Sequence, residues 1–186
     1  MLINGRKIER PRSPQTYSDR ELICRGWLTW KLYGKKIPVM TTKGVTPEYA
    51  KKCARALNGL SEETIDAICG GAKKYCLWYA KNMRRDINSI MRVPIFEDTP
   101  PREILADISP KRLAIAAPDS ESVGFCVSFD CEWENWRDMY NPTPYGLCVA
   151  VLDGKAVFVG TDMIFFPGDK NLETFMNWAD GFENFD

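Results

Sequence analysis

The chain of 186 residues is 45% hydrophobic and 27% charged, and its 25 basic and 25 acidic residues give a formal net charge of zero. This composition excludes a disordered or fibrous chain, and no apolar run is long enough to span a membrane. Residues 1–7 lack the apolar core of a signal peptide, so we expect a cytoplasmic protein. The absence of histidine excludes Ser-His and Cys-His nucleophiles and every histidine-ligated metal site.

The cysteines point to the same compartment. Seven are present, an odd number without a CxxC pair, and most fall in apolar patterns where a free thiol behaves as a small buried hydrophobe. They are Cys24, Cys53, Cys69, Cys76, Cys126, Cys131 and Cys148. We therefore expect seven free thiols in a reducing environment, with no metal centre and no cofactor.

The zero net charge hides a division of the chain into two parts. Residues 1–95 carry 19 Lys/Arg against 8 Asp/Glu, a net charge of +11, whereas residues 96–186 carry 6 against 17, a net charge of −11. Such asymmetry is typical of a basic part that meets an acidic partner, or of two parts that neutralise each other. We expect a basic part over residues 1–95 and an acidic sheet domain over residues 96–186.

The first elements are predicted to be strands. Residues 2–8 form at most a short strand, and the β-rich pattern of residues 22–33 turns at Gly34-Lys35 into residues 36–41. This pattern predicts a β-hairpin. Pro38 lacks an N–H to donate, so we expect the second strand of this hairpin to lie at the edge of a sheet.

Two helices with clear ends follow the hairpin. Thr46-Pro47 provides an N-cap and a proline at the first helical position, and Gly59 is a C-terminal stop. Ser61 then caps a second helix whose apolar stripe recurs at three- and four-residue steps and ends before Pro94. The short connection predicts an αα-hairpin.

The acidic part is predicted to form an antiparallel sheet. Residues 94–101 have the composition of a linker, and a short helix over residues 102–106 follows. Alternation over residues 125–134 indicates a strand with one apolar and one increasingly acidic face. Asp153-Gly154 predicts a type I′ hairpin between residues 147–152 and 155–159, and a terminal helix is expected over residues 169–179. The expected fold is thus α+β, with an N-terminal β-hairpin and αα-hairpin, then a C-terminal antiparallel sheet with a short terminal helix.

A resemblance to a known family rests on residues of this sheet. The first motif is the alternating Phe129, Cys131 and Trp133, which Glu134 follows. The others are Gly146-Leu147, the Asp153-Gly154-Lys155 hairpin and the preceding strand over residues 108–115. Over residues 105–160 the chain resembles an uncharacterised bacterial family of unknown function with an acidic-tryptophan hairpin signature. Related families are placed among toxin-immunity proteins, which act by binding. Here the family's histidine is absent and the connection before Gly146 is longer, so the histidine's role does not carry over.

The leading interpretation is a non-catalytic, cytoplasmic, protein-binding domain of the toxin-immunity type that uses an acidic aromatic surface. Carboxylates recur at every second residue and are followed by a connection rich in Trp and Tyr. Such aromatic side chains dominate the binding energy at protein interfaces. The expected partner-binding residues are Asp130, Glu132, Glu134, Trp136, Asp138 and Tyr140. The expected partner is another protein, of basic charge, and not a membrane. The same carboxylates leave a divalent-cation site or a carboxylate-dependent hydrolase as alternatives.

A second alternative is nucleic-acid binding by the basic part of the chain. On the second helix an aromatic side chain lies among cations at helical spacing, a pattern that meets phosphates and bases. The patch consists of Lys74, Trp78, Lys81 and Arg85. The opposing interpretation is that Trp78 packs beneath the C-terminal sheet, because large aromatic side chains are usually mostly buried.

Overall fold

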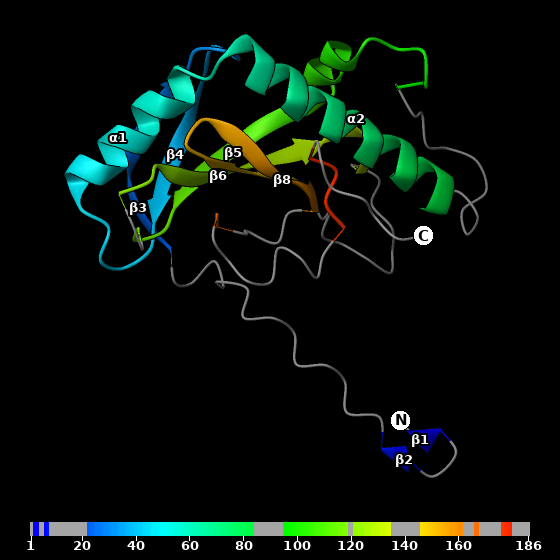
Figure 1. Ribbon diagram of the computed structural model, residues 1–186, viewed down its shortest axis with the longest axis horizontal. Helices are drawn as coiled ribbons and strands as arrows, with labels where there is room; N and C mark the ends of the chain where they lie inside the picture. The colour runs from blue at the N-terminus through cyan, green and yellow to red at the C-terminus, as the bar shows by residue number, and fades with distance from the viewer. Residues whose placement is uncertain are drawn as a thin grey trace.

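A computed structural model describes residues 2–3, 6–7, 22–83, 95–118, 121–134, 146–161, 166–167 and 176–179. The central element is a six-stranded sheet in the order β3-β4-β5-β6-β7-β8. Its strands are β3 (Ile23–Trp30), β4 (Lys35–Thr41), β5 (Ile108–Ile115), β6 (Gly124–Cys131), β7 (Leu147–Leu152) and β8 (Lys155–Thr161). Helices α1 (Pro47–Asn58) and α2 (Glu62–Met83) lie across one face of this sheet (Figure 1). The α+β prediction is confirmed.

The remaining described elements are short. Strands β1 (Leu2–Ile3) and β2 (Arg6–Lys7) pair with each other, and the 3-10 helices η2 (Pro101–Ala106) and η3 (Glu132–Glu134) flank β5 and β6. The predicted short helix over residues 102–106 is therefore confirmed.

The predicted N-terminal hairpin and C-terminal strands form one sheet. Strands β5 to β8 are antiparallel to their neighbours, as predicted, but β4 pairs with β5 in parallel. A parallel connection needs a long crossover, which the helices and η2 provide. The sheet consequently takes strands from both sides of residue 95.

Pro38 does not place β4 at the edge. The edge strand is β3, and β4 pairs with β5 only from Val39 to Thr41. Pro38 precedes this paired segment, so its missing N–H removes no hydrogen bond from the β4–β5 ladder.

Local signals for the helix and hairpin ends are confirmed. The Thr46 hydroxyl accepts from the N–H of Tyr49, 3.2 Å away, and α1 ends one residue before Gly59. Asp153 and Gly154 have φ values of 48° and 80°, the left-handed conformation that a type I′ turn requires. Of the long second helix, the structure describes residues 62–83, and the predicted extension toward Pro94 lies outside the described residues.

Residues 176–179, at the end of the described chain, form neither a helix nor a strand. Trp178 donates its backbone N–H to the oxygen of Val159 at 2.8 Å, and the buried Asn177 side chain bonds to the backbone of Val157 and Val159. Residues 176–179 thus cover the outer edge of β8. The predicted terminal helix is wrong over these residues, because their hydrogen bonds go to an otherwise open strand edge; residues 169–175 lie outside the described residues.

The main core fills the space between α2 and the sheet. The predicted apolar stripe of α2 is buried, including Ile65, Ile68, Ala72 and Cys76. A smaller cluster on the opposite sheet face includes Cys126, Cys148 and other buried apolar side chains. All seven cysteines are free thiols, six of them buried. No helix within the described residues is long and apolar enough to cross a membrane.

Gly71 sets how closely α2 approaches the sheet. A Cβ atom at this position would lie 2.8 Å from the backbone oxygen of Trp178 and 2.9 Å from the Cβ of Val159, whereas a Cβ at the adjacent Gly70 meets nothing within 4 Å. The close packing of the helix on the sheet therefore requires glycine at position 71, whereas position 70 has room for a side chain.

We predict opposite effects of alanine at these two positions. Gly70→Ala should raise the free energy of unfolding by about 0.5–1 kcal/mol, because alanine favours the helix. Gly71→Ala should lower it by about 1–3 kcal/mol, because the added methyl group overpacks the helix–sheet contact. Urea unfolding of both variants checks this, and equal shifts in one direction would contradict the packing described here.

Candidate binding surface

The first carboxylates predicted for the site lie at the end of β6. Asp130 is exposed, and its Oδ1 lies 3.3 Å from the Nζ of Lys111 on β5. Glu132 is exposed at the start of η3. The prediction that Asp130, Glu132 and Glu134 share one strand face is wrong, because β6 ends at Cys131 and the chain turns into a 3-10 helix.

The other predicted partner-binding residues are not tested. Only the backbone of Glu134 is described, and Trp136, Asp138 and Tyr140 lie outside the described residues. Their role in binding stays a prediction.

The structure describes three of the four residues of the alternative basic patch. Lys74 and Lys81 are exposed, and Arg85 lies outside the described residues. Trp78 is half-buried, with its ring centroid 5.4 Å from that of Trp178 and 6.3 Å from that of Tyr75. Its ring thus packs against aromatic neighbours of the core, as the opposing interpretation predicted.

A different aromatic side chain is open to solvent. Phe96 is 65% exposed although its neighbour Ile95 is buried. Two hydrogen bonds close the turn, since the Phe96 N–H donates to the Thr99 hydroxyl at 3.0 Å and the Thr99 N–H donates to the Phe96 oxygen at 3.1 Å. The Lys73 ammonium on α2 donates to the backbone oxygens of Glu97 and Thr99. An exposed aromatic ring is therefore held on a turn that is anchored to a helix.

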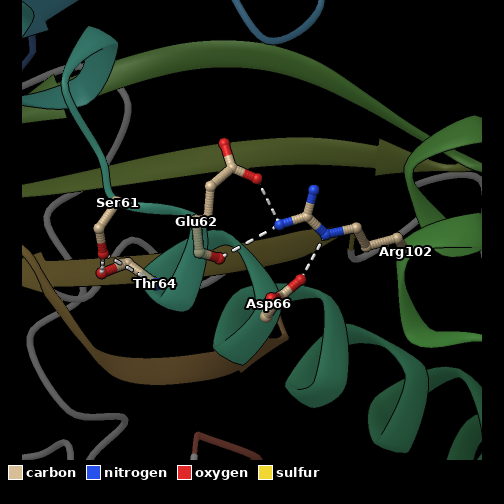
Figure 2. Close-up of polar contacts among 5 residues, drawn as sticks. All are labelled: Ser61, Glu62, Thr64, Asp66 and Arg102. Atoms are coloured by element: carbon tan, nitrogen blue, oxygen red, sulfur yellow. Dashed lines mark hydrogen bonds and ion pairs between the residues drawn. The ribbon is translucent and has the colours of Figure 1, made fainter.

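Two carboxylates of α2 bind the guanidinium of Arg102 on η2 (Figure 2). Its Nη2 lies 2.6 Å from Glu62 Oε2, and its Nε donates to Asp66 Oδ1. Hydrogen bonds to Asp66 and Glu62 raise the pKa of Arg102 above its ordinary value. One positive charge is shared by two carboxylates, so this cluster keeps a net negative charge.

The start of α2 is fixed independently of Arg102. Ser61 accepts from the N–H of Thr64, which confirms the predicted cap, and the two hydroxyl oxygens lie 2.9 Å apart (Figure 2). The Thr64 hydroxyl donates to the oxygen of Gly154 at 2.6 Å. These contacts tie the first turn of α2 to the β7–β8 turn and hold Glu62 in place.

The turn and η2 dock along one side of α2. Glu62, Asp66 and Lys73, which make these contacts, lie four and then seven residues apart, a spacing that places them on one helix face. The Phe96 turn and the Arg102 cluster are therefore connected through α2. We call the following set the acidic surface: Glu62, Asp66, Phe96, Glu97, Asp98, Glu103, Asp107 and Glu132.

The C-terminal end of η2 contacts Glu132, one of the residues predicted to bind a partner. The N–H of Glu132 donates to the backbone oxygen of Asp107 at 2.9 Å. Burial, with a smaller contribution from the negative charge of Glu132, raises the pKa of Asp107. Crowded carboxylates thus extend from α2 along η2 to η3.

Sequence reasoning missed Phe96 because it interpreted residues 94–101 as a linker. The available signal was the tripeptide Phe96-Glu97-Asp98 between prolines, where an aromatic side chain has no periodic partner that predicts burial. The turn that carries Phe96 is anchored by Lys73, which is 23 residues earlier in the chain, and no local pattern reveals that contact.

Within the described residues no group of three metal-ligating side chains comes together. Burial raises the pKa of both Cys53 and Cys69 to about 11, so these thiols stay protonated and unreactive at neutral pH.

These observations define an α+β domain with helices on one face of a mixed sheet and an acidic surface that includes one exposed aromatic ring. Residues 16–135 match the family described as a domain of unknown function (DUF6985), and the chain belongs to this family. The prediction of an uncharacterised family is confirmed to that extent, and of the predicted residues 105–160 the match includes 105–135. The match covers β3 through η3 and includes the acidic surface. No curated protein and no solved structure matches the chain.

We predict that Asp107 opposes folding at neutral pH. The raised pKa means that the folded protein disfavours the ionised carboxylate of Asp107. The resulting loss of stability is present at pH values above the pKa of the folded protein. It disappears as the pH falls below the ordinary value of 3.8, where the carboxyl group is protonated in both the folded and the unfolded protein. Asp107→Asn should therefore raise the free energy of unfolding at pH 7, and this gain should disappear by pH 3. Urea unfolding at both pH values measures it, with the exposed Asp98→Asn as a control that should change little. A gain that persists at pH 3 would argue against a charge effect.

Proposed function

We propose that this protein is a non-catalytic protein-binding domain that holds a basic partner through its acidic surface. The observation that carries the proposal is the exposure of Phe96 on an anchored turn that also carries the exposed Glu97 and Asp98. An aromatic ring on a prearranged turn loses little conformational freedom on binding, and this preorganisation favours affinity. The carboxylates of this surface steer a basic partner and raise its association rate.

Within the part of the chain that the structure describes, the charge of Glu62 and Asp66 is only partly compensated, because both pair with the one guanidinium of Arg102. Lys73, on the same helix, is engaged with backbone oxygens. Glu97, Asp98 and Glu103 are exposed on the turn and on η2. A partner with lysine or arginine side chains around an apolar pocket complements this arrangement.

A toxin-immunity role is the specific form of this function that we favour. An immunity protein acts by covering a surface of its toxin, and an acidic surface suits a toxin whose substrate is a polyanion. The resemblance of the sheet motifs supports this assignment. The free, mostly buried thiols support a cytoplasmic location, where cysteines remain reduced.

We predict that Phe96→Ala weakens partner binding by about 2 kcal/mol or more, mainly through faster dissociation, because a central aromatic anchor is lost. The variant should fold normally, since the ring is mostly exposed. The measurement is capture of the partner from the source cell by the parent protein and by Phe96→Ala, followed by binding kinetics with the purified partner. Trp27→Ala, which removes an exposed ring outside the acidic surface, is the matched control.

Charge reversal at the same turn should act differently. Glu97→Lys should slow association, with an effect that shrinks as salt is raised, because exposed charges steer encounter more than they hold the complex. A partner that binds Phe96→Ala and Glu97→Lys as well as the parent, or whose binding depends on Lys74 and Lys81, would exclude the acidic surface as the site.

A further inference from the structure

The opposite charge gathers around the β3 edge of the sheet. Residues 22–60, which contain β3, β4 and α1, hold eight Lys/Arg and one acidic residue, Glu48. Figure 1 shows these elements together at one end of the sheet. The proposed function does not use this region.

A groove of about 470 Å³ lies between α1 and β3. It is lined by Leu28, Lys31, Lys51, Ala54, Arg55, Asn58 and Gly59. The apolar side chains come from both elements. The cations lie on both sides of the groove, with Lys31 in the turn that follows β3 and with Lys51 and Arg55 one turn apart on α1. The lining thus combines an apolar part with positive charge on two walls.

The cations of this groove have no acidic partner within the part of the chain that the structure describes. Asn58, by contrast, is fully engaged: its Oδ1 accepts from the N–H of Lys31 at 2.8 Å, and its Nδ2 donates to the oxygen of Thr29 at 3.0 Å. These bonds satisfy the Thr29 oxygen of β3 and the N–H of Lys31 beside the groove. The side chains that line the groove are therefore the groups we expect a ligand to contact there.

We propose that this groove binds a short acidic segment of another protein, with an apolar side chain seated between flanking carboxylates. Leu28 and Ala54 contact the apolar side chain, and Lys31, Lys51 and Arg55 pair with the carboxylates on either side. This is a second site of opposite polarity to the acidic surface, and it recognises a different class of partner.

The arrangement favours an acidic peptide over a nucleic acid. Single-stranded nucleic acids bind where aromatic rings and cations alternate along one track. The exposed ring nearby, Trp27, precedes Leu28 on β3 and so points to the other face of the sheet, where the ammonium of Lys36 lies 5.9 Å from its ring centroid. The groove therefore has cations and an apolar lining but no aromatic ring on which bases stack.

The test uses fluorescence anisotropy with a labelled peptide, Asp-Glu-Glu-Leu-Phe-Glu-Asp-Glu, and the full chain. We expect saturable binding that Arg55→Glu and Lys51→Glu each weaken at least about tenfold, because each reverses a charge at the groove. Lys43→Glu is the matched control, since it makes the same charge change at an exposed position of the basic region outside the groove. It should stay within about twofold of the parent. Circular dichroism verifies that each variant is folded.

Further probes separate the competing outcomes. A peptide with serine in place of Leu and Phe should bind at least about tenfold more weakly, because it lacks the apolar side chains. The variant Phe96→Ala should leave peptide binding unchanged, so this test is independent of the acidic surface. Any of four results overturns the proposal: no peptide binding at 1 mM, equal losses in Lys43→Glu and Arg55→Glu, equal binding of the serine peptide, or tighter binding of a twelve-nucleotide oligothymidylate that Arg55→Glu abolishes.

Discussion

The close contact of α2 with the sheet is the constraint on which the rest of the structure depends. Gly71 brings the helix backbone against Val159 of β8 and against the segment that carries Trp178. Because this contact leaves no room for a side chain, it fixes the distance between helix and sheet. The edge of β8 is covered by that same segment, so core packing and edge protection are coupled.

The acidic surface follows from the position of α2. Once the apolar stripe of the helix is buried, its next face points outward with Glu62, Asp66 and Lys73. Arg102 and the Phe96 turn bind to that face, and both belong to the crossover that a parallel β4–β5 pair requires. The element that completes the sheet topology thus also supplies the surface proposed to bind a partner.

Charge separation along the chain becomes a separation in space. The acidic surface includes residues of α2 from the basic part of the sequence, while the basic groove lies between α1 and β3. The net charges of the two sequence halves describe this spatial separation only coarsely. Glu62 and Asp66 belong to the acidic surface but lie in the half with a net charge of +11. The two proposed binding sites thus differ in polarity.

The sequence by itself determined the features that depend on near neighbours: the caps at Thr46 and Ser61, the Asp153-Gly154 turn and the buried stripe of α2. Each follows from backbone conformation or periodicity within one element, which adjacent residues dictate. Only the tertiary structure decided that β4 pairs with β5, that Trp178 runs along β8, and that the Phe96 turn is anchored by Lys73. Those outcomes depend on backbone groups and charges that meet across long stretches of chain, where local propensity carries no information about the partner.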